Sequence, residues 1–474
     1  MKRIAIFLSL LFAACTSPSY PGIDSPTYSP NSQTDKDIIA YIDQRLEEEY
    51  YWLDEVEEKS YLFDREYKKW NDYLPASLNI LTTNVDDGSV KSNGQRSFYS
   101  YISEYQASTR ATTNGFGILL HYTILVGNGE NNYYYFIVDH VYPGSPADEA
   151  GIKRGDMITM INGGYITSGN YSSHFTAIQN STKQSLKLKL QRQTTKESFT
   201  KEISKAQYDA SPVAHHEVLD IDGKKIGYLV YTSFDKEYDE ELCSALQELA
   251  AEGANEVILD LRINRGGSVN SAAVLCSALM PATMEGKTLC TLMRNPKNKK
   301  IQQSTTFNLK DTGTILNLSR LTVLCSNYSA SASELVIMGL RGLDVPILLI
   351  GSQTEGKNCG MDVTRVKIAD KNLEFAPITF MCFNAKGDGD WGEGITPDVN
   401  LKEEGNKHGL HDANYPMPRA DWGDEHYDIA LAVALAEITG KQISTSATRS
   451  TSLDYYPSTL GIECPVEGIR LYHE

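Results

Sequence analysis

From residue 226 onward, short apolar runs alternate with helical patterns, and this alternation limits the possible folds more than any other feature of the sequence. Strands that alternate with helices form a largely parallel sheet with helices packed on it. The sequence therefore predicts an α/β domain over residues 212–440. Its expected strands are 226–232, 256–260, 321–325 and 346–350, and its expected helices are 239–251, 269–279, 333–340 and 428–438.

Different patterns precede and follow this domain. Residues 111–195 contain short apolar runs separated by glycine and asparagine, which predicts a β-rich domain with strands at 116–122, 133–139, 157–161 and 186–190. Upstream, apolar positions at helical spacing predict a small helical segment within residues 35–110. Residues 441–474 lack strong periodicity, and we interpret them as a tail without an assigned role.

The amino terminus carries two basic residues, an apolar run and small residues before Cys15. This order is typical of a secretory signal peptide, here residues 1–15. A cysteine directly after the small residues resembles a bacterial lipobox, although Phe12 stands where an aliphatic residue is commoner. Residues 16–34, rich in Ser, Pro and Tyr, would then form a tether. We expect a lipoprotein lipidated at Cys15, anchored in the cell envelope and facing the periplasm or the cell exterior; plain secretion and a coincidental cysteine are the alternatives.

Composition argues against several other function classes. The 44 Lys and Arg residues against 61 Asp and Glu residues give a formal net charge of −17, which repels phosphate backbones. Nucleic acid is therefore not an expected partner. The cysteines beyond Cys15 are scattered and mostly lie in apolar runs, which indicates small buried side chains rather than a disulfide framework. No common metal-binding motif occurs, so we predict no metal site.

Two predicted strand-to-helix junctions carry candidate catalytic groups. At the first, Gly266 and Gly267 form a glycine pair whose backbone N–H groups can face an anion. At the second, the run S-A-S-A-S-E at 329–334 places a serine hydroxyl on a tight strand-to-helix turn with the N–H of the next residue beside it, as in a nucleophile elbow. In the alternative interpretation, Ser329, Ser331 and Ser333 only cap a helix, and Glu334 in its first turn complements the helix dipole.

Lys357 is a third candidate, since it follows the apolar strand expected at 346–350. A lysine at the edge of an apolar core loses hydration, which favours the neutral amine and lets it act as a base. Glu355 would oppose this if its side chain faced the amine, and we expect it to point elsewhere. Asp260 and Arg262 are interpreted as structural residues that pair internally.

The run Y-P-G-S-P-A at 142–147 resembles the PDZ domains of bacterial proteases. In that family a glycine-rich loop presents backbone N–H groups to the C-terminal carboxylate of a peptide, and the peptide adds a strand to the sheet edge. The resemblance places that loop at Gly115, Phe116, Gly117 and Ile118. Alternatively, the two glycines only shape a turn.

The runs D-L-R-I-N-R-G-G at 260–267 and S-A-S-A-S-E at 329–334, followed by Gly356-Lys357, resemble the C-terminal processing peptidases, also called tail-specific proteases. This resemblance implies a ClpP/crotonase-like peptidase core, serine endopeptidase activity, no cofactor, and protein or peptide substrates with free C-termini. It also implies Ser331 as nucleophile, Lys357 as general base, and an oxyanion hole made by the N–H of Ala332 with one from the glycine pair, preferably Gly267 over Gly266.

One position departs from the family pattern. Some members carry a glutamine four residues after the lysine that orients it, whereas Met361 stands here. Methionine offers no useful hydrogen bond to an amine, and Asn358 is the nearest side chain that could replace the glutamine. The second interpretation is therefore a catalytically inactive peptide-binding lipoprotein on the same fold.

Overall fold

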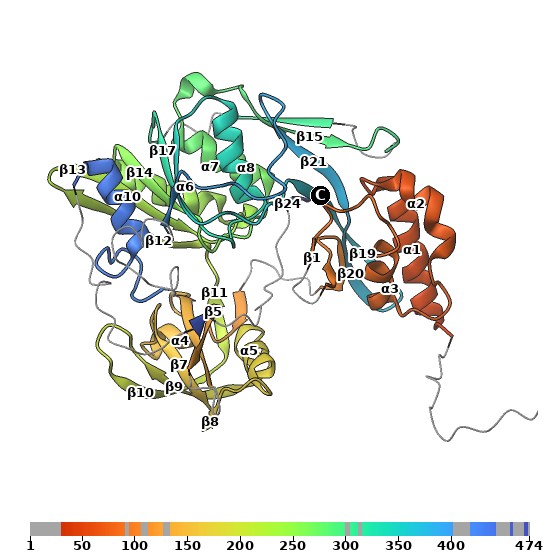
Figure 1. Cartoon of the computed structure of the whole chain (residues 1–474), viewed down its shortest axis with the longest axis horizontal. Coiled ribbons are helices and arrows are strands. Elements are labelled where there is room, and N and C mark those ends of the chain that lie inside the picture. Colours follow the sequence, from red (N-terminus) through yellow and green to blue (C-terminus); the bar gives the residue numbers. More distant parts are fainter. Residues whose placement is uncertain are drawn as a thin grey trace, which may run out of the picture.

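A computed structural model describes residues 30–90, 94–105, 112–126, 133–298, 304–310, 315–401, 418–441, 456–457 and 469–472. Figure 1 shows the N-terminal helices at one end of the molecule, the PDZ-like sheet below, and the α/β core above it. The predicted signal peptide, most of the tether and Cys15 lie outside the described residues. Among the described residues, no helix combines the length and apolar character that crossing a bilayer requires.

The core sheet confirms the predicted α/β domain. Its strand order is β12 (Val213–Ile221), β13 (Lys224–Tyr231), β14 (Glu256–Asp260), β17 (Leu321–Cys325), β18 (Ile347–Gly351) and β22 (Val399–Asn400). All neighbours pair in parallel except β12 and β13. Helices cover both faces, which explains why the central strands are apolar throughout. These helices are α6 (Asp239–Ala251), α7 (Val269–Leu279), α8 (Ala332–Gly342) and α10 (Ile429–Thr439), with the short helices η2 (Lys236–Tyr238) and η3 (Ala282–Met284) between them.

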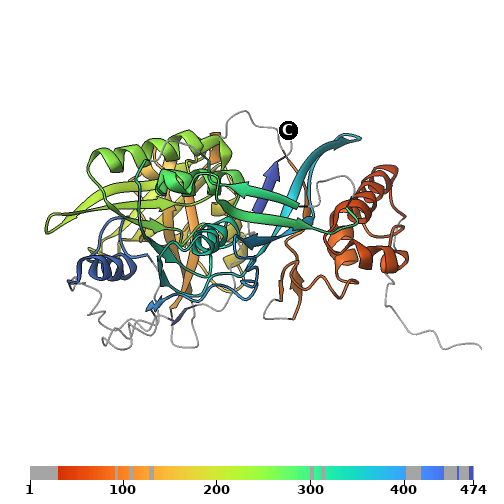
Figure 2. The same ribbon diagram turned by 90° about the horizontal axis from the view of Figure 1, so that it is seen from above.

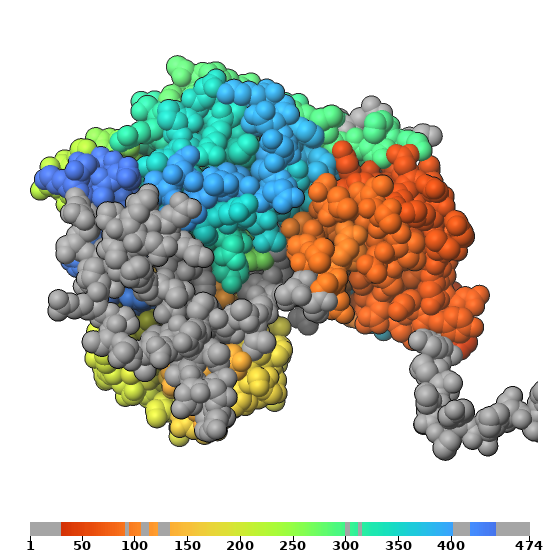
Figure 3. Space-filling view, viewed as in Figure 1, coloured from red at the N-terminus to blue at the C-terminus, as the bar shows by residue number. Residues whose placement is uncertain are grey.

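A second sheet, which the sequence did not predict, connects the core to the N-terminal helices. Its order is β16 (Ser304–Asn308), β15 (Thr288–Arg294), β21 (Ile378–Asn384), β19 (Cys359–Ile368), β20 (Lys371–Ala376) and β3 (Tyr101–Glu104). One apolar cluster joins it to the predicted helical segment, whose elements are α1 (Gln33–Glu49), α2 (Leu53–Lys59), η1 (Ser60–Leu62), α3 (Trp70–Leu78), β1 (Ser89–Val90) and β2 (Arg96–Ser97). Figure 2 shows this segment beside the strands of the second sheet, and Figure 3 shows it in contact with the rest of the molecule.

The β-rich domain is an antiparallel sheet with its own apolar core. Its strand order is β10 (Ser198–Ser204), β9 (Ser185–Gln191), β7 (Met157–Ile161), β6 (Tyr133–Val141), β5 (Ile118–Val126) and β23 (Tyr456–Pro457), and β8 (Gly164–Tyr165) pairs with β7. A separate two-stranded sheet is formed by β4 (Thr112–Gly115) and β11 (Ala206–Asp209). The helices of this domain are α4 (Pro146–Glu149) and α5 (Tyr171–Gln179). The strand expected from residue 116 begins at Ile118, because Gly117 turns the chain with a φ of 78° against Ser145.

The tail contributes strands although its sequence shows no period. Tyr456 and Pro457 pair antiparallel with β5 at Leu125 and Ile124. Farther on, β24 (Ile469–Tyr472) pairs in parallel with β19 from Gly360 onward. The tail thus pairs with both the PDZ-like sheet and the second sheet.

The cysteines within the described residues behave largely as predicted, whereas Cys464 lies outside them. Cys276, Cys290, Cys325, Cys359 and Cys382 are buried free thiols, and Cys243 is half-buried.

Candidate active site

The candidate catalytic residues follow neighbouring parallel strands of the core sheet. The glycine pair lies on the loop after β14, Ser331 on the turn after β17, and Lys357 on the loop after β18. Carboxyl ends of adjacent parallel strands meet at one edge of a sheet, which is where α/β folds place their ligands. The core therefore gathers the candidates that the sequence scatters over 92 positions, from Gly266 to Lys357.

Ser331 is held on a strained turn at the start of α8. Its φ of 64° and ψ of −114° are unusual for a side chain with a Cβ, and such conformations cluster at functional sites. The side chain is 0% exposed, and its Oγ has no hydrogen-bond partner among the described residues. The flanking hydroxyls are used structurally, because Ser329 donates to Leu261 O at 2.8 Å and Ser333 donates to Asn264 O at 2.9 Å.

Gly266 packs against this serine, whereas Gly267 packs against Phe234. Gly266 adopts a φ of 108°, and a Cβ there would lie 2.7 Å from the Cβ of Ser331. Its N–H donates to Asn264 Oδ1 at 2.9 Å. In contrast, no hydrogen bond of the described residues uses the N–H of Gly267 or of Ala332. Two backbone donors near the serine turn are therefore available to an anion.

Lys357 is 0% exposed, and Tyr99 of the N-terminal segment packs against its amine. Its Nζ lies 4.0 Å from the centroid of the Tyr99 ring, a cation–π distance. Because Ser331 Oγ has no hydrogen-bond partner, the serine and the lysine amine are not hydrogen-bonded in this structure. Hydrogen bonds between catalytic groups are often long in unliganded sites and shorten when substrate binds.

Glu334 connects the two catalytic loops, a role that the sequence analysis missed. Its buried carboxylate accepts hydrogen bonds from the N–H of Ser331 at 2.7 Å and of Lys357 at 2.8 Å through Oε2. Through Oε1 it accepts from the N–H of Gly356 at 2.8 Å and the hydroxyl of Thr354 at 2.6 Å. Burial raises the pKa of Glu334 to about 7, while these donors favour the carboxylate. The S-x-x-E spacing indicated the start of a helix, but no local pattern indicated that Glu334 would also contact the loop that carries Lys357.

The two residues considered for orienting Lys357 have other contacts. Met361 is 0% exposed and packs in the apolar cluster between β19 and the N-terminal helices. Asn358 donates its side-chain amide to Gly389 O at 2.6 Å, which fixes the loop after β21.

The PDZ-like loop is partly satisfied from within the domain. The N–H of buried Phe116 donates to Ser181 Oγ at 3.2 Å, and Ile118 begins β5. Two residues farther, the N–H of Leu120 donates to Gln179 Oε1 at 3.0 Å, from the end of α5. A peptide that paired with this part of β5 would have to replace both side-chain acceptors.

A buried polar network links the PDZ-like domain to the core, and it confirms that Asp260 and Arg262 pair internally. Arg262 Nη2 lies 2.6 Å from both Asp260 Oδ2 and Asp428 Oδ2. Arg154 of the PDZ-like domain lies 3.9 Å from Asp428 and stacks on Trp422, with its guanidinium 3.6 Å from the ring centroid. The link depends on residues far apart in sequence, so no local motif could reveal it.

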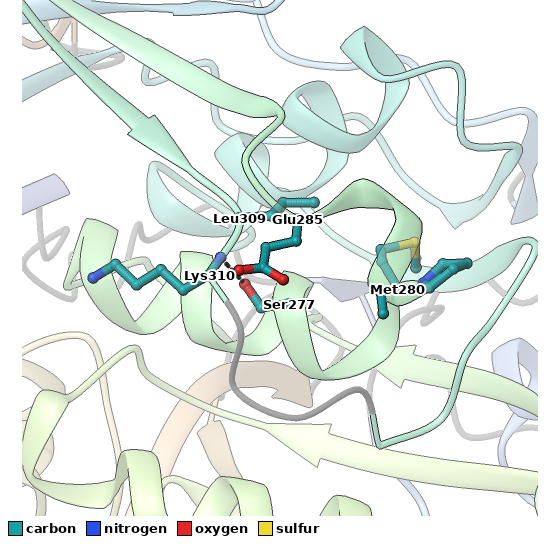
Figure 4. A pocket seen from close by; sticks show the side chains of 7 residues that line it. Ser277, Met280, Glu285, Leu309 and Lys310 are labelled. Carbon is teal, nitrogen blue, oxygen red and sulfur yellow. Dashed lines mark hydrogen bonds between the residues drawn. The ribbon is translucent and has the colours of Figure 1, made fainter.

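A small surface hollow at the end of α7 contains none of the candidate residues. It is lined by Ser277, Met280, Pro281, Ala282, Glu285, Leu309 and Lys310 (Figure 4). The backbone N–H of Lys310 donates to Ser277 Oγ at 2.9 Å, so the hydroxyl is engaged within the protein. We assign no chemistry to this hollow.

Comparisons with known proteins agree with this architecture. The sequence model of peptidase family S41 matches residues 225–401, and that of the PDZ domain matches residues 137–192. The former range contains both Ser331 and Lys357.

Three curated relatives carry protease names. A probable CtpA-like serine protease of Staphylococcus aureus is 26% identical over 54% of this chain and 48% of its own length. A carboxyl-terminal-processing protease of Synechocystis is 28% identical over 45% of this chain and 47% of its own length. The carboxy-terminal processing protease CtpB of Bacillus subtilis is 25% identical over 42% of this chain and 39% of its own length. The chain thus spans about half the length of such relatives, or less.

A solved structure extends the likeness in fold to most of the chain. The crystal structure of a candidate S41 protease from Bacteroides fragilis matches with a TM-score of 0.65 and 24% sequence identity. The match covers 88% of this chain and 99% of that one. Residues 225–401 thus match the model of peptidase family S41, residues 137–192 match that of the PDZ domain, and the chain has the S41 protease fold.

Proposed function

We propose that this chain is a serine endopeptidase in which Ser331 is the nucleophile and Lys357 is the general base. The observation that carries the proposal is the set of unused hydrogen-bonding groups at the turn that holds Ser331. The Ser331 hydroxyl is buried on a strained turn without a hydrogen-bond partner among the described residues, and the N–H groups of Gly267 and Ala332 are unused. Ser331 and Glu334 are also arranged as a capping box at the start of α8, and the cap and the catalytic role are compatible.

Each residue then has a defined chemical task. Ser331 Oγ attacks the scissile carbonyl carbon, and the neutral amine of Lys357 takes the hydroxyl proton. The N–H groups of Gly267 and Ala332 stabilise the oxyanion of the tetrahedral intermediate. The ammonium of Lys357 returns the proton to the leaving amine, and water hydrolyses the acyl-enzyme by the reverse sequence. Glu334 holds the two loops at a fixed distance from each other, because its carboxylate accepts hydrogen bonds from the N–H groups of both Ser331 and Lys357.

The PDZ domain is proposed to select substrates by their free C-terminal tails. The tail carboxylate would bind the N–H groups of the loop formed by Gly115, Phe116, Gly117 and Ile118, and the preceding residues would pair with β5. Amidation of the C-terminus should then slow cleavage, because it removes the charge that this loop would bind. Equal rates for acid and amide would contradict tail recognition without affecting the assignment of Ser331.

We further propose that lipidation of Cys15 anchors the protein in the cell envelope, facing the periplasm or the cell exterior. The proposal is supported by the basic, apolar and small-residue order before Cys15. Labelling of cells with a fatty-acid analogue should mark the wild-type protein and not Cys15→Ala. Equal labelling of the two proteins would contradict it.

The decisive experiment compares cleavage of an unstructured polypeptide with a free apolar C-terminus by wild type, Ser331→Ala and Lys357→Ala. We expect Ser331→Ala to fall to background and Lys357→Ala to lose about 100- to 10,000-fold, the range of general-base catalysis. Cleavage by Ser331→Ala at the wild-type rate would contradict the proposal.

A catalytically inactive peptide-binding protein is the second candidate. Two observations favour it: Met361 replaces the glutamine of some family members, and Ser331 and Lys357 are not hydrogen-bonded. In this case wild type and Ser331→Ala would both fail to cleave the polypeptide, while both would bind its tail.

A further inference from the structure

The N-terminal segment reaches into the candidate active site at Lys357. The lysine side chain is 0% exposed, and its Nζ lies 4.0 Å from the centroid of the Tyr99 ring. Tyr99 lies between β2 and β3, more than 250 residues before the lysine in sequence. A π face at this distance attracts an ammonium group and also offers it a surface of fixed shape.

Asp87 fixes the backbone that carries this ring. It is 0% exposed and accepts hydrogen bonds from the N–H groups of Tyr99 at 3.0 Å and Ser100 at 2.8 Å. It also accepts from the hydroxyls of Ser100 at 2.6 Å and Tyr50 at 2.7 Å. Burial raises the pKa of Asp87, and the hydrogen bonds from Ser100 and Tyr50, with a smaller contribution from the charge of Lys357, oppose that rise.

Two further hydrogen bonds join this loop to the catalytic domain. The Tyr99 hydroxyl donates to Glu355 Oε1 at 3.3 Å, two residues before Lys357. The N–H of Ile378, the first residue of β21, donates to Ser100 Oγ at 2.9 Å. The Tyr99 ring is therefore held both from the N-terminal segment and from the domain that it approaches.

We infer that the N-terminal segment completes the active site: Tyr99 is a positioning residue that holds the amine of Lys357, in place of the glutamine that position 361 lacks. The inference rests on the proposed function. Met361 is buried in the apolar cluster formed with the N-terminal helices, where it stabilises the same interface that brings Tyr99 to the lysine. The N-terminal segment would thus stabilise the fold through Met361 and orient the base through Tyr99.

The test compares Tyr99→Leu and Tyr99→Phe in the full chain, with kcat and KM measured on the unstructured polypeptide. Leucine removes the π face that stabilises the ammonium formed when the neutral amine of Lys357 takes the serine proton, so kcat should fall up to about 30-fold with KM within about twofold, which corresponds to about 2 kcal/mol for a desolvated cation–π contact. Phenylalanine keeps the ring and loses only the hydrogen bond to Glu355, so it should retain kcat within about threefold of wild type. The rate at which a fluorophosphonate probe labels Ser331 should follow the same order, because labelling depends on activation of the serine.

Tyr101→Leu is the matched control. Tyr101 lies in β3 and directs its hydroxyl to Glu374, so this variant removes a tyrosine from the same segment without affecting Lys357. Its kcat should stay within about twofold of wild type, since its side chain is bonded elsewhere. Thermal unfolding shows whether each variant is folded, and Tyr99→Met, a flexible apolar replacement, serves if the leucine variant is not.

The outcomes separate this inference from the proposed function. An unchanged kcat in a folded Tyr99→Leu or Tyr99→Met variant, with Ser331→Ala inactive, would overturn the role of Tyr99 and leave the peptidase assignment intact. Equal losses in Tyr99→Phe and Tyr99→Leu would also overturn it, since the ring alone would then be insufficient. Wild-type activity in Ser331→Ala would instead remove the proposed function itself.

Discussion

The chain has two candidate surfaces for binding peptides, and they differ in how far their backbone N–H groups are already used. In the PDZ domain, the N–H groups of Phe116 and Leu120 donate to the side chains of Ser181 and Gln179. At the catalytic turn, the N–H groups of Gly267 and Ala332 take part in no hydrogen bond of the described residues.

This difference indicates that the two surfaces are organised in different ways. Buried N–H groups are normally satisfied, and the rare exceptions call for an explanation. At the Ser331 turn, the explanation that we propose is an oxyanion site prepared in advance, in which the donors need no rearrangement at the moment of reaction. At the PDZ groove a peptide must first replace internal acceptors, and each replacement reduces the net gain from binding.

The largest effect is expected from Gly267→Ala, which disturbs the prepared donors. Gly267 has a φ of 133°, and a Cβ there would lie 2.1 Å from the carbonyl oxygen of Phe234. The backbone must therefore shift and carry its N–H away from the oxyanion. We expect kcat to fall about 100- to 1,000-fold, the effect of losing one such donor, about 2.7–4 kcal/mol of transition-state stabilisation.

Gly223→Ala separates this effect from the general cost of a positive φ. Gly223 has a φ of 82° on the turn between β12 and β13, and a Cβ there meets no atom within 4 Å. This control should lose about 1 kcal/mol of stability, typical of a left-handed residue, and keep its kcat. Wild-type kcat in a folded Gly267→Ala protein would show that the open N–H is not used.

A somewhat smaller effect is expected from Glu334→Gln, measured as stability against pH. Burial raises the pKa of Glu334 to about 7 in the folded chain, from 4.5 as the ordinary value. Between these values the folded protein binds the proton and the unfolded chain does not, so stability falls as pH rises from about 4.5 to about 7. Glutamine does not titrate. The free energy of unfolding of wild type should therefore drop relative to the variant by roughly 3 kcal/mol across this interval.

A constant difference between the two proteins over that interval would show that Glu334 has an ordinary pKa. The predicted drop would instead strengthen the contrast between the two surfaces. It would measure the free energy of unfolding that is lost because the Glu334 carboxylate is buried at the Ser331 turn. Urea unfolding at several pH values provides the measurement.

Local patterns predicted the nucleophile half of the site far better than the base half. The elements α6, α7, β14 and β17 have the predicted bounds, because each is a short segment with a clear period and a strand-to-helix turn. The serine turn and the glycine pair follow directly from these elements. The second sheet was missed because it is assembled partly from strands far apart in the chain, such as β3 with β20 and β15 with β21, although β19 and β20 form a local hairpin.

The same limit explains why Tyr99, Asp87 and Glu334 escaped notice as parts of the site. Their roles depend on contacts between loops that meet only in the folded chain, and their residue types are common at surfaces and caps. Glu334 was noticed for the helix dipole, a local effect, although its carboxylate also accepts the N–H of Lys357. The predicted roles of Ser331, Lys357, Gly267 and the PDZ loop remain predictions until the variants are measured.

The smallest effect, from Gln179→Ala, addresses the PDZ side of the comparison. Alanine removes the Gln179 acceptor of the Leu120 N–H, so a peptide that pairs at this position no longer has to displace that side chain. A hydrogen bond contributes about 1 kcal/mol net, so the affinity for a fluorescent peptide with a free apolar C-terminus should rise about fivefold. Gln184→Ala, an exposed glutamine ahead of β9, is the control and should bind like wild type. Weaker binding by Gln179→Ala would mean that Gln179 helps to form the peptide-binding groove. The internal acceptors of the PDZ domain would then support peptide binding rather than oppose it, and the contrast with the open N–H groups at the Ser331 turn would be smaller.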